Sequence, residues 1–162
     1  MNNIHHTAII YPGVTISDNV YIGAFCIIGA PAEHKLYWGK ESKHSVHIGE
    51  GAIIHGHVTI DAGTERTTFI GDDTFIMKHV YIGHDSFIGH GATLSAHVSI
   101  GGFSNIGYNA NIGMGATVHQ KTSVGSNCMI GMNTTITKKS IIESGGCYIG
   151  TPAKFLRWNK IK

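Results

Sequence analysis

The sequence has little charge, little cysteine and no long hydrophobic run at its start, and each shortage excludes a class of protein. Only 14% of its 162 residues are charged, and the net charge is +2 with neutral histidines, too small and too dispersed for nucleic-acid binding. The opening residues MNNIHHTAII contain no basic region and no apolar run, so we expect no secretory signal, no membrane span and a cytoplasmic protein. Cys26, Cys128 and Cys147 are expected to be ordinary small side chains and not disulfide partners or nucleophiles.

The periods of an α-helix and of an alternating strand are also missing, and a period of six residues replaces them. An aliphatic residue recurs twelve times at this spacing, at Ile70, Ile76, Ile82, Ile88, Leu94, Ile100, Ile106, Ile112, Val118, Val124, Ile130 and Ile136. A small residue follows four places later, for example Thr74, Ser86 and Ala92. A fixed period with a fixed size rule predicts a parallel β-helix, whose narrow axis holds the large residue beside the small one.

Residues that tolerate a left-handed backbone mark the expected corners of this β-helix. The third place after the aliphatic residue is mostly Gly, Asn or Asp, as in Asp73, Gly91 and Asn109. These residue types turn the chain at little cost. Three hexapeptides then form one triangular coil of about 18 residues.

The same register covers most of the chain, with two interruptions. It opens at Ile4, is lost over residues 30–47 and resumes at Ile48, so residues 30–47 are predicted to project as a loop. Four extra residues between Ile60 and Ile70 predict a second, smaller excursion. After Ile136 the pattern decays, and residues 140–162 are predicted to form a cap with an irregular last coil and a short terminal helix or similar end. We therefore predict one all-β domain of residues 1–162 with about six to seven coils.

Three of the twelve histidines share one place in the repeat. His57, His79 and His97 each occupy the corner position three places after the aliphatic residue, so they are predicted to form a ladder up one corner of the solenoid. Such a ladder either contacts a ligand or subunit, or consists of histidines that merely tolerate the turn. We include His79 and His97 among the expected substrate-binding residues.

A second group combines a base, an acid and a glycine. His84 and Asp85 follow Ile82 directly after Gly83, and Gly102 stacks one coil above His84, with Gln120 one coil further on. An imidazole held by a neighbouring carboxylate can act as a general base, and a glycine amide can bind a developing oxyanion. The alternative is a turn aspartate that only satisfies the N–H of its neighbour.

Several segments resemble one family of enzymes. IHHTAIIYPGVTIS, HKLYWGKES, IDAGT, IMKHVYIGHD and ATVHQ resemble the UDP-N-acetylglucosamine O-acyltransferases of lipid A biosynthesis. IGHDSFIGHGATLSAHVSIGG and IGTPAK equally resemble the acetyl-CoA-dependent sugar acetyltransferases of the sialic-acid and aminosugar type. The chain is identified as a member of the hexapeptide-repeat acyltransferases, whose fold is a left-handed parallel β-helix that forms homotrimers.

The resemblance implies roles for particular residues. Both branches place the catalytic base at the position of His84, with an acid at Asp85 and a thioester-polarising amide at Gly102. In the first branch, the positions that match His119 and the loop residues Lys35 and Tyr37 help to hold substrate. The donor's pantetheine arm is expected to lie past Gly102 and Gln120.

The same resemblance implies a reaction. An acyl group, expected to be acetyl, moves from a CoA or acyl-carrier-protein thioester to a hydroxyl or amine of a nucleotide-linked sugar. No bound cofactor and no metal are expected, and the sites are expected to lie between the subunits of a homotrimer.

Two other functions compete with this one. His79 and His84 are five residues apart, which resembles the zinc pair of carbonic-anhydrase-like hydratases on the same fold. The register counts against a metal site, because Gly89 occupies the second ligand position of that family and His79 lies at a corner. A non-catalytic solenoid scaffold is the other possibility, but such a protein needs neither a placed His-Asp pair nor a long aromatic loop.

Overall fold

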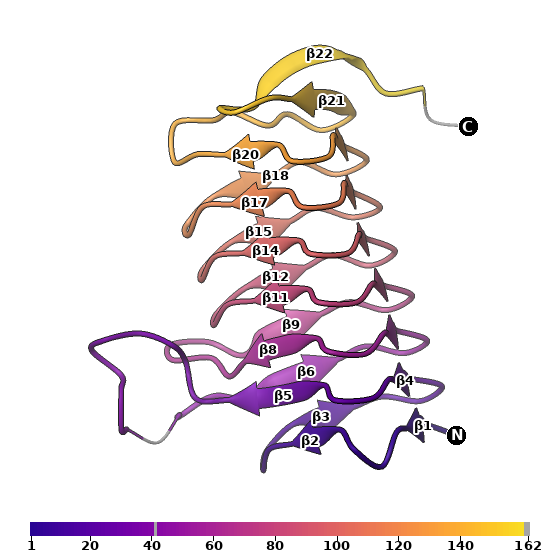
Figure 1. The fold of residues 1–162 in the computed structure, drawn as a ribbon, viewed down its shortest axis with the longest axis vertical. Coiled ribbons are helices and arrows are strands. Elements are labelled where there is room, and N and C mark those ends of the chain that lie inside the picture. The colour runs from indigo at the N-terminus through magenta and orange to yellow at the C-terminus, as the bar shows by residue number, and fades with distance from the viewer. Residues whose placement is uncertain (41, 161–162) are drawn as a thin grey trace.

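The chain forms a three-sided parallel β-helix. The computed structural model describes residues 1–40 and 42–160. Short strands stack into three sheets that run along the solenoid, and the amino terminus and the last strand lie at opposite ends (Figure 1). Except for the last strand, each strand pairs in parallel with the strand one coil away, as in Phe75 with Thr93. The predicted all-β architecture of hexapeptide repeats is confirmed.

The three sheets are named A, B and C here. Sheet A contains β1 (Asn3–Ile4), β4 (Tyr21–Ile22), β7 (Ile53–Ile54), β10 (Phe75–Ile76), β13 (Thr93–Leu94), β16 (Asn111–Ile112), β19 (Met129–Ile130), β21 (Gly146–Ile149) and β22 (Lys154–Trp158). Sheet B contains β2 (Ile9–Ile10), β5 (Ile27–Ala30), β8 (Thr59–Asp61), β11 (Tyr81–Ile82), β14 (Ser99–Ile100), β17 (Thr117–Val118) and β20 (Thr135–Ile136). Sheet C contains β3 (Thr15–Ile16), β6 (Val46–Ile48), β9 (Thr68–Ile70), β12 (Phe87–Ile88), β15 (Asn105–Ile106) and β18 (Ser123–Val124).

The repeated aliphatic residues form the core, as predicted. From Ile22 to Ile136 these side chains are buried, and the small residues between them, such as Ala92 and Ala110, are buried too. At the amino-terminal end Ile4 remains 39% exposed, because no coil covers it from below. Each buried isoleucine contributes about 1.5–3 kcal/mol, so stability accumulates along the stack and is lowest at the first coil.

The corners have the left-handed backbone that the sequence predicts. Asp73 and Asn109 both have φ near +53°, and Gly91 has φ +66°. His79 and Phe103 adopt the same conformation, with φ of +62° and +59°, although this region costs a residue with a side chain of their size about 1–2 kcal/mol. Large residues at these corners therefore point to a use for the side chain outside the solenoid.

The solenoid is longer than predicted. Sheet A contains eight parallel strands followed by the antiparallel β22, so there are about eight coils and not six to seven. The last coil escaped the sequence pattern because Tyr148 replaces the aliphatic residue in the core, where it is only 3% exposed. β22 covers the end of sheet A, so of the two expected endings, a short helix or a cap, the chain has a cap formed by a strand.

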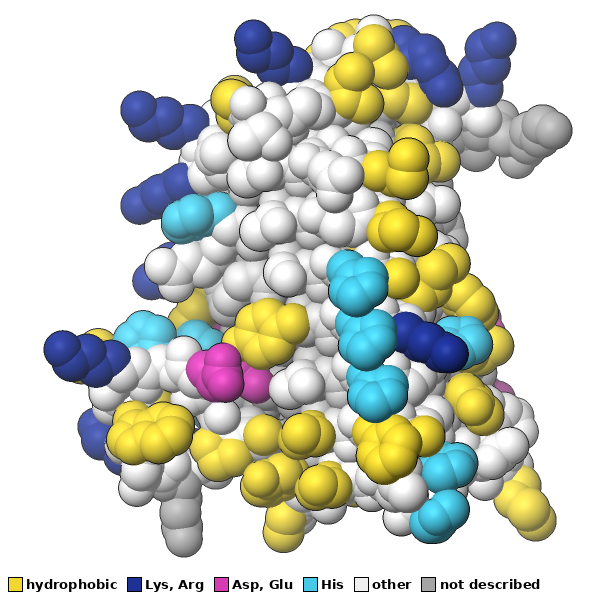
Figure 2. All heavy atoms as spheres, in the orientation of Figure 1, with side chains coloured by type: hydrophobic (Ala, Val, Ile, Leu, Met, Phe, Trp, Pro, Cys, Tyr) yellow, Lys and Arg dark blue, Asp and Glu magenta, His cyan; other side chains and the backbone are white. Residues whose placement is uncertain are grey.

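The outer surface of this cap carries hydrophobic side chains with lysine and arginine beside them (Figure 2). Phe155, Leu156 and Trp158 are each at least half exposed. The part of the chain that the structure describes contains no helix with the length and hydrophobicity that a membrane crossing requires. The three cysteines are buried and unpaired, and burial raises the pKa of the Cys26 and Cys128 thiols, which disfavours the reactive thiolate.

Candidate active site

Asp85 lies in a cradle built by the four-residue excursion. It occupies the left-handed corner after β11, with φ +61°. Its carboxylate accepts the backbone N–H groups of Thr64, Glu65 and Arg66 at 2.7–3.0 Å, and the Thr64 hydroxyl at 2.7 Å. Burial raises the pKa of Asp85, but hydrogen bonds from His84, Thr64 and the excursion amides outweigh it and bring the pKa to about 2. Asp85 is therefore a fixed anion at neutral pH.

His84 is held by this anion. Its Nδ1 lies 2.6 Å from Oδ2 of Asp85, and the residue is only 5% exposed. A carboxylate only accepts hydrogen bonds, so Nδ1 carries the hydrogen and Nε2 of the neutral ring is left as the acceptor. The pair thus has the protonation pattern of a general base with an orienting acid.

Gly102 faces the free nitrogen of His84, as predicted. A Cβ atom at position 102 would lie 2.7 Å from Nε2 of His84, so only glycine fits there. The backbone N–H of Gly102 has no hydrogen-bond acceptor among residues 1–40 and 42–160. An amide without an internal partner, beside a base, can bind an oxyanion without first breaking another bond.

The projecting loop folds over its own chain's His84. The rings of His34 and Tyr37 have centroids 5.6 Å and 6.4 Å from that of His84, and Phe103 approaches from the other side at 5.3 Å. The Tyr37 hydroxyl donates to Glu65 at 3.4 Å, which ties the loop to the excursion. Tyr37 therefore reaches the site, whereas Lys35 is exposed on the loop.

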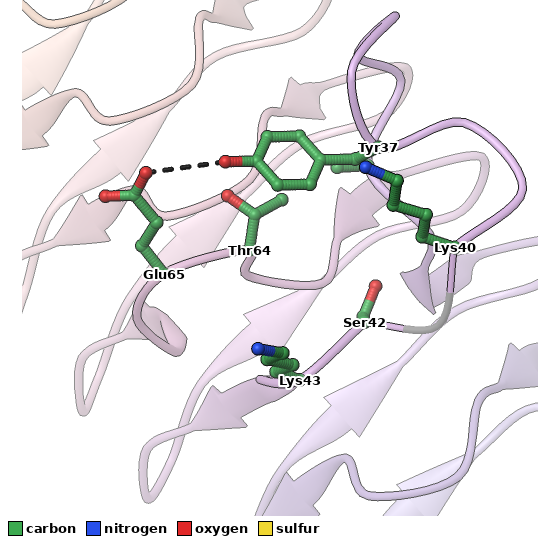
Figure 3. Close-up of a pocket in the computed structure, with 7 residues that line it drawn as sticks. Tyr37, Lys40, Ser42, Lys43, Thr64 and Glu65 are labelled. Carbon is green, nitrogen blue, oxygen red and sulfur yellow. Dashed lines mark hydrogen bonds between the residues drawn. The ribbon is translucent and has the colours of Figure 1, made fainter.

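A cavity opens beside the projecting loop (Figure 3). It has a volume of about 340 Å³ and lies between the loop and the excursion. Its lining consists of Ala32, Tyr37, Lys40, Ser42, Lys43, Thr64 and Glu65. Two lysines face one glutamate, so the cavity favours an anionic group.

His119 and Gln120 lie further along the solenoid. Gln120 follows the register above Gly102: a Cβ at Gly101 would meet the Gln120 nitrogen at 2.5 Å. His119 is exposed, and its Nδ1 lies 2.8 Å from the Gln120 carbonyl oxygen. Within the described chain, the His84 ring contacts the rings of His34, Tyr37 and Phe103 and the carboxylate of Asp85, and not His119 or Gln120.

The predicted ladder of histidines is present, and it lies at a corner other than the one that holds His84. Adjacent rings of His57, His79 and His97 stack at 4.9 Å, and Phe25 continues the column at 5.2 Å from His57. Figure 2 shows this column of histidine side chains on the surface. Desolvation and the neighbouring imidazoles His97 and His57 lower the pKa of His79. The ladder precedes sheet B and His84 follows it, so one chain does not bring them together.

The separation between the ladder and His84 also counts against the alternative of a metal site. His79 takes part in the ladder, while Nδ1 of His84 is occupied by Asp85. Within the described ranges, no three His, Cys, Asp or Glu side chains gather in a metal-binding group. The spacing of five residues between His79 and His84 therefore does not produce a pair of ligands in one chain.

Sequence reasoning missed one pair beside His84. Asp61 is 1% exposed, and its Oδ2 accepts the Tyr81 hydroxyl at 2.6 Å and the Glu33 N–H at 3.4 Å. Burial raises the pKa of Asp61, and it raises that of Tyr81 as well. The available signal was that Asp61 directly follows a core isoleucine, where most repeats have glycine.

Comparison with known proteins finds hexapeptide repeats and similar acyltransferases. Residues 67–102 match the family model of the bacterial transferase hexapeptide, and residues 105–138 match the hexapeptide repeat of succinyl-transferase. The acyl-[acyl-carrier-protein]–UDP-N-acetylglucosamine O-acyltransferase of Chlorobium phaeobacteroides is 31% identical over 123 residues, which cover 52% of this chain and 46% of that protein. The chain thus spans about half the length of this relative.

Solved structures give the same result. UDP-N-acetylglucosamine O-acyltransferase from Moraxella catarrhalis has a TM-score of 0.79 and 26% identity, and the match covers 97% of this chain and 75% of that one. PerB from Caulobacter crescentus, solved with CoA and GDP-perosamine, has a TM-score of 0.66 and 21% identity over 96% of this chain and 56% of its own, which shows the fold alone. The chain therefore carries the hexapeptide repeats of bacterial transferases and is similar, over much of its length, to UDP-N-acetylglucosamine O-acyltransferases.

Proposed function

We propose that this chain transfers an acyl group from a thioester to a hydroxyl or amine of a nucleotide-linked sugar. The observation that carries the proposal is that Nε2 of His84 lies against Gly102, a residue whose N–H has no acceptor among residues 1–40 and 42–160. A base and an oxyanion donor at one point are what acyl transfer requires. The family relationship points to the same chemistry.

In the proposed reaction His84, Asp85 and Gly102 each have one role. Nε2 of His84 removes the proton of the acceptor as its oxygen or nitrogen attacks the thioester carbon. Asp85 keeps the ring in the correct tautomer and stabilises the imidazolium, and the Gly102 N–H binds the tetrahedral oxyanion. The C–S bond then breaks, and the imidazolium returns its proton to the leaving thiolate. A base contributes about 10²–10⁴ in rate and one oxyanion donor about 10²–10³.

The surroundings support this choice of substrates. A pantetheine arm of the donor is proposed to run along the outer surface past Gly102 and Gln120, which are stacked one coil apart. Lys40 and Lys43 at the 340 Å³ cavity supply cations for the phosphates of a nucleotide sugar. The relatives' names include an acyl-carrier-protein donor with a UDP-sugar, and CoA with a GDP-sugar. The donor for this chain is accordingly acyl-CoA or acyl carrier protein, in the cytoplasm.

The proposal includes a homotrimer with sites between subunits. One prism with flat faces encloses little of a ligand, whereas two adjacent prisms form a cleft. The face of sheet A exposes Tyr21, Ile53 and Met129 by 37–38% each, an apolar strip suited to a neighbour. In this arrangement the ladder residues His79 and His97 of one subunit approach the His84 site of the next and contact its substrate.

The test is thiol release from acetyl-CoA with a panel of nucleotide-linked sugars. The wild type is expected to release thiol only with an acceptor present, and His84→Ala is expected to lose this release. His90→Ala is the matched control, because His90 also pairs with a carboxylate, Asp72, at 3.0 Å, but on an exposed corner. Equal release by His84→Ala and wild type, or no release with acetyl-CoA or acyl carrier protein donors, would overturn the proposal.

A further inference from the structure

Asp61 lies at the amino-terminal end of a column of stacked residues on sheet B, in which the next two residues are glycines. Ile60 pairs with Ile82, and Ile82 pairs with Ile100, so the residues that follow them stack in the order Asp61, Gly83, Gly101. The two glycines approach the backbone of the next coil so closely that no side chain fits. Asp61 is therefore the first side chain of this column on the amino-terminal side of His84.

The geometry of acyl transfer divides the space around His84 into two sides. The Gly102 amide lies one coil above His84 on the carboxy-terminal side, and it takes the thioester oxygen in the proposed function. The acceptor must place its nucleophile at Nε2 from the remaining side. That side is bounded by β8, by the loop with His34, and by Tyr81 of β11. Asp61 lies in this boundary, on the acceptor side.

The carboxylate of Asp61 has no cation as a partner. Its contacts within the described residues are the Tyr81 hydroxyl at 2.6 Å and the Glu33 N–H at 3.4 Å, both on Oδ2. The titratable groups that face it are Tyr81, Glu33 and His84. A carboxylate that is 1% exposed and has no paired cation is costly for the fold, so its presence calls for a positive partner that arrives with the ligand.

We propose that Asp61 binds the ammonium group of the acceptor and accepts its first proton, so that the substrate is an amino sugar and the product an amide. This inference rests on the proposed function and chooses between its two nucleophiles. An ammonium has no lone pair and must lose one proton before it attacks and a second as the C–N bond forms. A hydroxyl loses only one. The site has a second base, Asp61, in addition to His84, which is the number an ammonium requires.

The step balances as follows. The R–NH₃⁺ group transfers one proton to Asp61 and becomes R–NH₂. Its nitrogen lone pair forms the C–N bond at the thioester carbon, and the carbonyl electron pair moves to the oxyanion at the Gly102 N–H. His84 takes the second proton from nitrogen. The oxyanion collapses, the C–S bond breaks, His84 protonates the thiolate, and Asp61 releases its proton to water.

The burial of Asp61 favours it as the acceptor of the first ammonium proton. Desolvation raises the pKa of its carboxyl, and the hydrogen bond from Tyr81 opposes the rise. A carboxylate with a raised pKa is a better proton acceptor than an exposed one. The Tyr81 hydroxyl and the Glu33 N–H both bond to Oδ2, so Oδ1 has no hydrogen-bond partner among residues 1–40 and 42–160.

The experiment compares matched acceptors. UDP-linked sugars with an amine at carbon 2, 3 or 4 are paired with the same sugars that carry a hydroxyl at that carbon, and thiol release from acetyl-CoA is measured from pH 6 to 10. Wild type is expected to prefer one of the amines. Asp61→Asn is expected to lose about 100-fold in kcat/KM for this amine at pH 7, and to regain activity as the pH rises through the pKa of the acceptor. Asp72→Asn, an exposed carboxylate elsewhere, should leave the profile unchanged.

A second variant guards against a folding defect. Tyr81→Phe removes the hydrogen bond that lowers the pKa of Asp61, so the acidic limb of the amine profile should move to higher pH, and circular dichroism should show the β-helix intact. The inference is overturned if wild type acylates hydroxyls and not amines. It is also overturned if Asp61→Asn keeps the wild-type profile, or loses activity equally at every pH. In all these cases an acceptor-dependent, His84-dependent thiol release would leave the proposed function standing.

Discussion

His84 and Asp85 are joined by a 2.6 Å hydrogen bond between Nδ1 and Oδ2, and three backbone amides of the excursion hold Asp85 in turn. Asp85→Asn should keep the side-chain shape but remove the charge that stabilises the imidazolium. We expect kcat to fall by about 10²-fold or more with little change in KM. Steady-state kinetics would check this, with Asp72→Asn beside His90 as the control. An unchanged kcat would show that Asp85 only satisfies the turn.

The Asp85 carboxylate also makes the free energy of unfolding depend on pH. The pKa of Asp85 is about 2 in the folded chain against an ordinary 3.8, so its contribution is present above about pH 4 and is lost as the pH falls from 4 towards 2. The amount is roughly 2 kcal/mol. Urea unfolding between pH 2.5 and 6 should show this loss in the wild type and a flatter profile in Asp85→Asn. Parallel profiles would contradict the assignment.

Gly102→Ala tests the close approach to His84. The new methyl group would lie 2.7 Å from Nε2, so the imidazole must turn away or the coil must shift. We expect a loss of at least about 10²-fold in kcat, because both the base and the oxyanion donor are displaced. Acetyl transfer and a thermal melt should be measured together. A fully active variant with an unchanged melt would show that the Gly102 amide has no part in the reaction.

The sequence could predict the solenoid because every coil repeats one packing rule. The core isoleucines, the left-handed corners, the His57 ladder and the Gly102 stack all follow from the register alone. An irregular last coil is expected from the sequence, but the residue that fills its axis could not be predicted, since Tyr148 breaks the aliphatic rule.

The missed parts of the site come from residues outside the repeat. The excursion at 63–67 looks like a gap in the pattern, and only its folding brings the Thr64 amide to Asp85, 21 residues later. The lost period predicts the loop at residues 30–47, but its contact with the His84 ring could not be predicted, because no period constrains its conformation. Asp61 lies within the repeat, and an acidic residue in place of glycine is only a weak signal until its burial and its bond to Tyr81 are seen.

Thr64 is predicted to position Asp85 through its hydroxyl, although it also lines the 340 Å³ cavity. Thr64→Ala removes the 2.7 Å hydroxyl bond but keeps the backbone amide. We expect a loss of about 1 kcal/mol in the free energy of unfolding, and a lower kcat with KM unchanged. Thr67→Ala is the matched control, because Thr67 is an exposed threonine of the same excursion. Partial recovery in Thr64→Ser, which restores a hydroxyl, would separate positioning from general destabilisation, and a KM effect would point to substrate contact instead.

Mixed trimers can test whether the histidine ladder serves a neighbouring site. In the proposed trimer each site combines His84 of one subunit with His79 and His97 of the next. His84→Ala subunits and His79→Ala/His97→Ala subunits should each be inactive or impaired alone. After unfolding and refolding together in equal amounts, random assembly gives a complete site in about one quarter of cases, because each site needs one particular subunit on each side. Activity near a quarter of the wild type would place the ladder in the neighbour's site, whereas no gain over the separate variants would place it elsewhere.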